Sequence, residues 1–185
     1  REVLAKNNLP RDLVINIDEV SVEATKELMA QCDLVLATGG AGMVKAAYRS
    51  GTPSQGVGAG NAVVIIDDTV DMADTADKIM RSKTFDYATS CSTENAVIIQ
   101  DTVYDTLIAE LEKTGGYLVG REEKERLRRT MWTEKGLNPK IVGQEAHVIA
   151  DLAGVELPPE KSFFMIPETG TGKDYPFSGE KISVT

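Results

Sequence analysis

A short apolar run that leads directly into a glycine-rich turn constrains the fold of this chain most. Asp33–Ala37 (DLVLA) is apolar after its first residue, which is typical of a parallel strand covered on both faces. Thr38–Gly42 (TGGAG) follows at once, and Met43–Ser50 is expected to form a helix that ends at Gly51. A strand, a glycine turn and a helix in this order favour an α/β fold.

The residues before this segment extend the same pattern. Leu13–Ile17 (LVINI) is rich in β-branched residues and is predicted to be a strand. Ser21 is expected to cap a helix over Val22–Gln31. Strand, helix, strand, glycine turn and helix form the order of a doubly wound α/β unit.

The glycine turn has two interpretations. Gly39 and Gly40 would let the backbone approach a ligand closely, and the N-terminus of the next helix offers free N–H groups to a phosphate. An ordinary tight turn between a strand and a helix would also use glycine, and the full G-x-G-x-x-G fingerprint is absent. The spacing alone leaves both interpretations open.

The rest of the chain is expected to continue the alternation of strands and helices. Gly51–Asn61, which is rich in glycine, is interpreted as a linker between lobes or as a loop close to a ligand. The expected strands are Ala62–Ile66, Ala96–Ile99 and Phe163–Ile166, and the expected helices are Val70–Lys83, Val103–Lys113, Arg121–Trp132 and Gln144–Ala153.

Cys91 lies at the centre of Thr84–Ala96 (TFDYATSCSTENA), between a predicted helix and a predicted strand. Its neighbours are small and polar, which favours a nucleophile presented on a loop. The alternative is a buried structural cysteine, because free cysteine is among the most buried residue types. A thiol of pKa about 8.5 is only a few per cent thiolate at neutral pH, but it is intrinsically very nucleophilic.

Composition excludes several classes of function. A net charge of −9 and a pI near 4.7 argue against a nucleic-acid partner, since phosphate binding needs a basic face. The 2 cysteines are too few for a disulfide framework and favour a reducing compartment. No run is long enough to span a membrane. His147, the single histidine, is interpreted as structural, and no metal site is expected.

Three motifs in order resemble the aldehyde dehydrogenase superfamily. They are Ala37–Pro53 running into GVGAGN at Gly56–Asn61, then SKTFDYATSCSTENAVII at Ser82–Ile99, then FSGEKIS at Phe177–Ser183. The resemblance is to the CoA-acylating branch, which includes the acylating acetaldehyde and sulfoacetaldehyde dehydrogenases and the aldehyde dehydrogenase half of bifunctional aldehyde–alcohol dehydrogenases. It covers essentially the whole chain.

The resemblance implies roles for individual residues. Cys91 matches the family's catalytic thiol, which attacks the aldehyde before hydride passes to NAD and the thioester is transferred to CoA. Thr38, Gly39 and Gly40 match the turn that lies against the dinucleotide. Glu180, in the E-K-I-S motif, matches the glutamate that binds the nicotinamide ribose hydroxyls. NADP is not excluded, because the acidic residue that reads the ribose lies outside this chain.

The resemblance also implies the organisation of the chain. Residues 1–60 correspond to the later part of an NAD-binding lobe, and residues 61–185 to the first part of a catalytic lobe carrying the cysteine. The superfamily is longer than 185 residues, so we expect an internal fragment without dehydrogenase turnover alone. The full-length protein is expected to be a cytoplasmic homo-oligomer, with a bacterial microcompartment as the alternative location.

One departure from the hydrolytic branch is informative. Hydrolytic relatives have a glutamate that activates water at the start of the glycine loop, where this chain has Val57. Without that base, water is a poor acyl acceptor, and a thiol such as CoA is favoured instead. Two other interpretations stay open: a non-catalytic α/β module of the same fold, and a related cysteine-dependent reductase of acyl phosphates.

Overall fold

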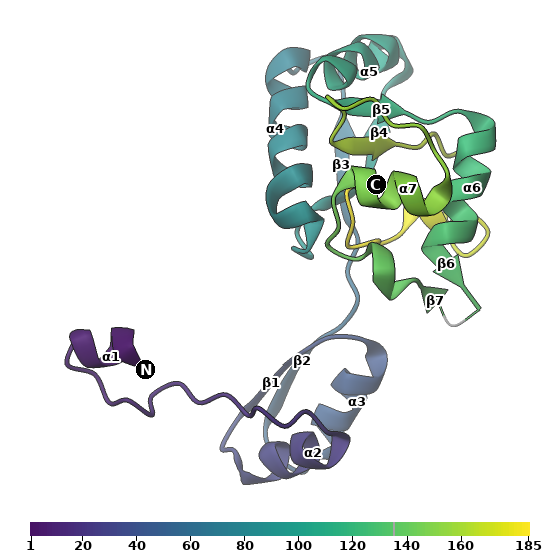
Figure 1. Ribbon diagram of the computed structural model, residues 1–185. Coiled ribbons are helices and arrows are strands. Elements are labelled where there is room, and N and C mark those ends of the chain that lie inside the picture. The colour runs from purple at the N-terminus through teal and green to yellow at the C-terminus, as the bar shows by residue number, and fades with distance from the viewer. Residues whose placement is uncertain (135) are drawn as a thin grey trace. The chain divides into compact units, whose positions relative to one another are not determined.

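The computed structural model describes residues 1–134 and 136–185 of the chain (Figure 1). It consists of two compact units, Arg1–Ala59 and Gly60–Thr185. Each unit has its own buried core, so each is described separately.

The first unit is built on two parallel strands. Strand β1 (Val35–Thr38) pairs with β2 (Ser54–Val57), with Val35 opposite Ser54 and Thr38 opposite Val57. Its helices are α1 (Glu2–Lys6), α2 (Val22–Gln31) and α3 (Ala41–Arg49). Its buried core is small and consists of Met29, Val35, Ala37 and Ala47.

Several predictions for this unit are confirmed. Ser21 caps α2, because its hydroxyl oxygen accepts a hydrogen bond of 3.0 Å from the backbone N–H of Ala24. The β1 strand and the α3 helix lie where the sequence places them, although α3 begins at Ala41, inside the glycine turn. The earlier start follows because glycine and alanine there impose no steric stop on the helix.

The predicted strand at Leu13–Ile17 is wrong. The segment is an irregular coil, and the exposed fractions of Leu13 and Ile15 are 60% and 68%. Its one backbone hydrogen bond, from Leu13 N–H to the Pro10 carbonyl, closes a local turn. A strand needs a neighbouring strand to accept its ladder of hydrogen bonds, and none of the described residues provides one here.

The interpretation of Gly51–Asn61 as a linker or loop is wrong for its central part, which is strand β2. Gly56 allows α3 to pack closely against this strand, since a Cβ atom at Gly56 would lie 2.6 Å from Val44 Cγ1. The N–H of Gly56 also donates to the Tyr48 hydroxyl at 3.1 Å. Glycine here therefore serves close packing between a helix and a strand.

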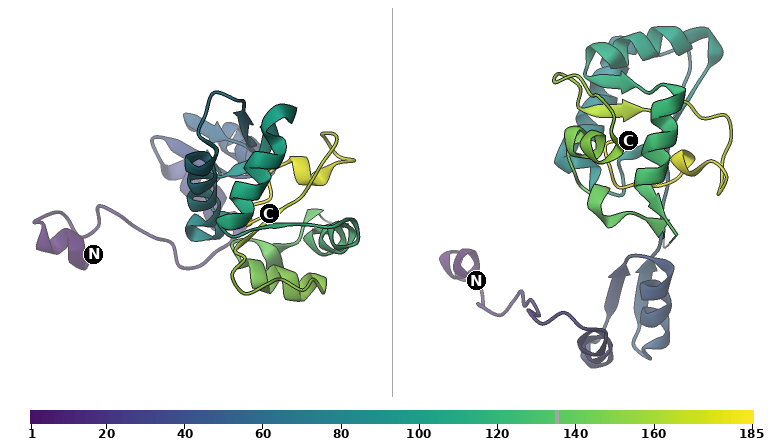
Figure 2. Two further views of the ribbon diagram at one scale, coloured as in Figure 1. Left: turned by 90° about the horizontal axis from the view of Figure 1, so that it is seen from above. Right: turned by 45° about the vertical axis from the view of Figure 1, so that its right-hand side comes forward.

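The second unit alternates strands and helices along most of its length (Figure 2). Its helices are α4 (Met72–Thr84), α5 (Tyr104–Lys113), α6 (Arg121–Met131) and α7 (Ala146–Ala153). Its strands are β3 (Ala62–Ile66), β4 (Glu94–Ile99), β5 (Gly116–Leu118), β6 (Trp132–Thr133), β7 (Gly136–Leu137) and β8 (Phe163–Met165). Short 3-10 turns are η1 (Phe85–Ala88), η2 (Asp101–Val103), η3 (Pro139–Ile141) and η4 (Pro176–Ser178).

The strands of this unit form three pairs. Strand β3 pairs with β4 and β5 pairs with β8, both in parallel, whereas β6 and β7 form a short antiparallel hairpin. Strand β5 was not among the strands expected from the sequence. A Cβ at Gly116 would lie 2.8 Å from the Leu111 carbonyl oxygen, so glycine permits the tight passage from α5 into β5.

The core of this unit explains why its helices form. Helix α4 packs on α5, and α6 packs on α7. Leu127 and Met131 anchor the charged helix α6, since both are fully buried. Trp132 packs edge-on against Phe177 with ring centroids 4.8 Å apart.

None of the helices formed by residues 1–134 and 136–185 is long and apolar enough to cross a membrane. Within the same residues, no group of three or more histidines, cysteines, aspartates or glutamates is arranged to hold a metal ion.

Candidate active site

Cys91 lies on an exposed turn between η1 and β4. Neither its sulfur nor its backbone N–H makes a hydrogen bond within the part of the chain that the structure describes. Cys32, the other free cysteine, is half-buried at the end of α2. Of the two thiols, Cys91 is therefore the one presented to a small molecule from solvent.

The backbone before Cys91 follows an unusual path. Asp86, Tyr87 and Ala88 adopt left-handed conformations with φ of 48°, 50° and 60°. A residue with a Cβ pays roughly 1–2 kcal/mol in this region, so three in succession persist only where the surroundings hold them. Ala88 is buried, and the hydroxyl of Tyr87 donates to Glu145 at 2.8 Å. The carboxylate raises the pKa of Tyr87, chiefly through this hydrogen bond.

Local hydrogen bonds close the turn around the sulfur. The hydroxyl of Thr89 donates to the Asp86 carboxylate and to the Asp86 carbonyl oxygen. The hydroxyls of Ser90 and Ser92 lie 2.8 Å apart, and the N–H of Thr93 donates to the Ser90 carbonyl at 3.1 Å. The small polar residues that flank Cys91 thus fix its turn from both sides.

The turn also packs against a distant part of the unit. Gly143 has a φ of +61°, and a Cβ atom there would lie 2.7 Å from Thr89 Cγ2. The N–H of Gly143 donates to the Ile182 carbonyl at 3.1 Å. Gly143 therefore connects the cysteine turn to the E-K-I-S segment that carries Glu180.

Two buried lysines hold the chain immediately after Cys91. Lys83, at the end of α4, donates from Nζ to the Glu94 carbonyl at 2.8 Å. Lys181 donates from Nζ to the Asn95 carbonyl at 2.7 Å. Burial lowers the pKa of Lys83 to about 8. The pKa of Lys181 is lowered to about 7, first by burial and then by the charge of Lys83.

Neither lysine was predicted as a site residue from the sequence. Lys83 was expected only as the last residue of a helix, and burial of its ammonium was not foreseen. Lys181 was quoted only as a member of the motif around Glu180. Nothing in the sequence signalled this burial, because lysine is almost never fully buried without partners and those partners lie in other segments.

Glu180 is half-buried and follows a braced backbone turn. Its carboxylate makes no hydrogen bond or ion pair with any of residues 1–134 or 136–185. Just before it, the Asn61 side-chain amide donates to the Ser178 carbonyl at 2.9 Å. Lys181, the next residue, donates to the Asn95 carbonyl, so the structure brings the Glu180 segment and the Cys91 segment together in one unit.

The glycine turn belongs to the other unit. The N–H of Gly39 donates to the Val57 carbonyl at 3.0 Å, which holds Thr38 and Gly39 at the carboxyl end of the β1–β2 pair. Gly40 is the N-cap of α3 and offers no side-chain cap. A Cβ atom at Gly40 or Gly42 would meet nothing within 4 Å, so the first turn of α3 is open to a ligand.

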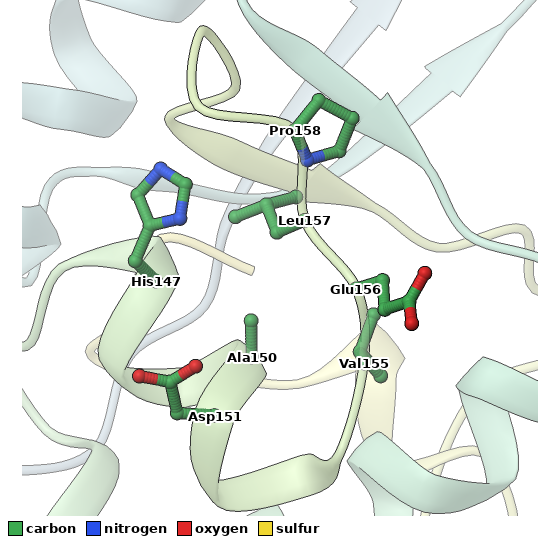
Figure 3. A pocket seen from close by; sticks show the side chains of 7 residues that line it. All are labelled: His147, Ala150, Asp151, Val155, Glu156, Leu157 and Pro158. Atoms are coloured by element: carbon green, nitrogen blue, oxygen red, sulfur yellow. The ribbon is translucent and has the colours of Figure 1, made fainter.

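A separate cavity of about 480 Å³ lies beside α7 (Figure 3). It contains His147 and Asp151, one helical turn apart, and Glu156, whose carboxylate points away from His147 (Figure 3). Its remaining lining comes from Ala150, Val155, Leu157 and Pro158. None of the residues predicted from the sequence as catalytic or cofactor-binding lines this cavity.

Comparison with known proteins defines the class. Residues 1–131 match the aldehyde dehydrogenase family, and the chain belongs to that family. Its fold is the α/β fold of the aldehyde dehydrogenases. A solved acetylating aldehyde dehydrogenase from Geobacillus thermoglucosidasius matches it with a TM-score of 0.93 and 40% identity, over 99% of this chain and 41% of that one.

Several of the matched proteins are named as acylating or acetylating dehydrogenases. The chain is 48% identical over 184 residues to a sulfoacetaldehyde dehydrogenase (acylating) from Cupriavidus necator, which covers 97% of this chain and 37% of that protein. It is also similar to a propionaldehyde dehydrogenase from Rhodopseudomonas palustris solved with bound CoA and an acylated cysteine (TM-score 0.86, 27% identity, 99% of this chain and 42% of that one). The chain spans about two fifths of the length of the sulfoacetaldehyde dehydrogenases that it matches.

Proposed function

We propose that this chain is part of a CoA-acylating aldehyde dehydrogenase, which oxidises a small aldehyde with NAD and transfers the acyl group to CoA. The observation that carries the proposal is Cys91, an exposed thiol on a turn held by buried anchors. It is supported by relatives that are 45–48% identical and are named as sulfoacetaldehyde dehydrogenases, two of them as acylating.

Cys91 is the proposed nucleophile. Its thiolate adds to the aldehyde carbon, and the carbonyl oxygen becomes an alkoxide. The free N–H of Cys91 is suited to donate to that oxygen, since it has no partner within the described residues. Loss of hydride from the carbon converts the adduct into a thioester on Cys91. The thiolate of CoA then attacks the thioester carbonyl, and the Cys91 thiolate leaves.

NAD, when bound, supplies the acceptor for that hydride. Thr38, Gly39 and Gly40 are proposed to hold its pyrophosphate, and the open first turn of α3 fits this role. Glu180 is proposed to accept hydrogen bonds from the nicotinamide ribose hydroxyls, which suits an unpaired and half-buried carboxylate. In this assignment residues 1–60 belong to the nucleotide lobe and residues 61–185 to the catalytic lobe.

The proposed acyl acceptor is CoA instead of water. Val57, which occupies the start of the glycine loop, is 51% exposed at the end of β2 and cannot act as a base. Gly56–Asn61 contains no carboxylate that could replace it. A thiol of pKa near 8.5 needs less help than water to attack a thioester. We further propose a cytoplasmic homo-oligomer, with a microcompartment as the alternative location and NADP as the alternative cofactor.

The test is formation of NADH by the full-length protein that contains this chain, with acetaldehyde, propionaldehyde and sulfoacetaldehyde, each with and without CoA. NADH formation that requires CoA, together with an acyl-CoA product detected by mass spectrometry, is the expected result. Turnover that is independent of CoA would contradict the acylating assignment. The 185-residue chain alone is expected to give no turnover.

Thiol labelling separates the enzyme from a non-catalytic module. Iodoacetamide is expected to alkylate Cys91 at least ~10-fold faster than Cys32, because Cys91 is exposed and Cys32 is half-buried. Peptide mapping after limited labelling measures the two rates. Equal rates, or faster labelling of Cys32, would favour the non-catalytic alternative.

A further inference from the structure

The turn before Glu180 is braced by side chains at three successive carbonyl groups. Lys181 Nζ donates to the carbonyl oxygens of Phe177 and Gly179, each at 2.8 Å. The Asn61 amide occupies the carbonyl between them, that of Ser178, at 2.9 Å. The backbone leading into Glu180 is therefore held by the next residue, Lys181, and by Asn61, which is 117 residues away from Ser178 in the sequence.

The same lysine reaches the cysteine segment. Besides the hydrogen bond from Nζ to the Asn95 carbonyl, the backbone N–H of Lys181 donates to Asn95 Oδ1 at 3.1 Å. Asn95 lies four residues after Cys91, at the start of β4. Lys181 and Asn95 thus form a double link between the chain that carries Glu180 and the chain that carries Cys91.

The geometry of this link uses the charged form of the lysine. Three carbonyl oxygens lie around Nζ, and only an ammonium has three protons to donate. Lys181 is 1% exposed, so water cannot replace a lost partner. Buried donors and acceptors that lose a partner are costly, and the link is correspondingly rigid.

The start of the turn, at Phe177, is also fixed. Phe177 is buried and packs edge-on against Trp132. Lys124 lies 6.0 Å from the centre of the Phe177 ring and forms an ion pair of 3.0 Å with Glu168. In contrast, the Glu180 carboxylate is unpaired within residues 1–134 and 136–185. The backbone before Glu180 is therefore fixed while the Glu180 side chain is free, and a preorganised ligand contact requires this arrangement.

We propose that Lys181 is a positioning residue that sets the place of Glu180 relative to Cys91. It does not touch the reacting atoms. It acts by holding the turn of Glu180 and the start of β4 as one body, so that the ribose of the cofactor and the thiol are aligned for hydride transfer. The inference rests on the proposed function, because it assigns Glu180 to cofactor binding.

The test is a double-mutant cycle in the full-length protein that contains this chain. Lys181→Met is expected to raise the KM for NAD by at least ~10-fold, because misplacement by about 1 Å is enough to cost much of a bound contact. Glu180→Gln is expected to raise it as well. If Lys181 acts through Glu180, then introducing K181M into the E180Q variant raises the KM for NAD by less than about twofold more. Independent, multiplicative effects would overturn the inference.

Lys83→Met provides the matched structural control. Lys83 is also a buried lysine that donates to a carbonyl at the start of β4, but it makes no hydrogen bond to the Glu180 turn. K83M is expected to leave the KM for NAD within about twofold, even where it destabilises the fold. An equal rise in K83M and K181M would show that loss of a buried lysine alone is responsible, and would overturn the inference.

Asn95→Ala keeps the test falsifiable if K181M does not fold. It removes the Oδ1 acceptor of the Lys181 N–H and leaves the ammonium and its three carbonyls in place. It is expected to raise the KM for NAD by about threefold, again only when Glu180 is present. An N95A effect that persists unchanged in the E180Q background would contradict the inference. An inactive wild-type protein would instead overturn the proposed function, and with it the role of Lys181.

Discussion

Replacement of Cys91 by serine is expected to lower kcat for CoA-dependent aldehyde oxidation by at least ~10³-fold. The physical reason is the acidity of the nucleophile. A serine hydroxyl has almost no alkoxide at neutral pH, and within the described residues the Cys91 side chain makes no hydrogen bond to a histidine or carboxylate that could activate a hydroxyl in its place. An ester on serine would also transfer to CoA more slowly than a thioester on cysteine.

The variant should remain folded, because Cys91 is exposed and its sulfur makes no hydrogen bond within the described residues. Steady-state NADH formation measures the loss, and intact mass after mixing with aldehyde and NAD measures the missing acyl adduct. Cys32→Ser is the matched control and is expected to retain activity within about twofold, since Cys32 lies in the other unit. Retention of more than about a tenth of the activity by C91S would contradict a cysteine mechanism.

The second large effect concerns the stability of the unit that carries Cys91. Leu127→Ala is expected to lower the free energy of unfolding by roughly 2–5 kcal/mol, because Leu127 is fully buried in the core. Urea unfolding followed by circular dichroism measures the change.

Leu152→Ala is the matched control for this substitution. It makes the same chemical change in helix α7 at a side chain that is 47% exposed, and it is expected to cost about 1 kcal/mol or less. Similar losses in the two variants would mean that α6 does not pack on the core as described.

The periodicity of the sequence was sufficient for most elements of the second unit. Strand β3 was predicted at its observed bounds, and α4, α5 and α6 at bounds within two residues. These elements combine strong apolar patterns with caps of their own, such as Asp71, whose carboxylate accepts from the Asp74 N–H at 2.9 Å. Local signals and tertiary packing agree in them.

The failures share one cause. Leu13–Ile17 has the composition of a strand, but it has no partner strand among the described residues. Strand β2 pairs with β1, but its sequence is not typical of a strand. Pairing of strands is decided between distant segments, so neither outcome is encoded in the local sequence. The same holds for β5, whose parallel partner β8 lies more than 40 residues further along the chain.

The sequence by itself determined the family, the α/β class and the nucleophile candidate. Small residues around Cys91, glycines after a buried strand and the E-K-I-S motif are all local signals, and they needed no coordinates. Only the tertiary structure decided how the cysteine turn is held: by left-handed residues from Asp86 to Ala88, and by Lys83 and Lys181 on successive carbonyls. The reason is physical, because burial of an ammonium depends on acceptors that other segments supply, and Asn95 and Lys181 are separated by 86 residues.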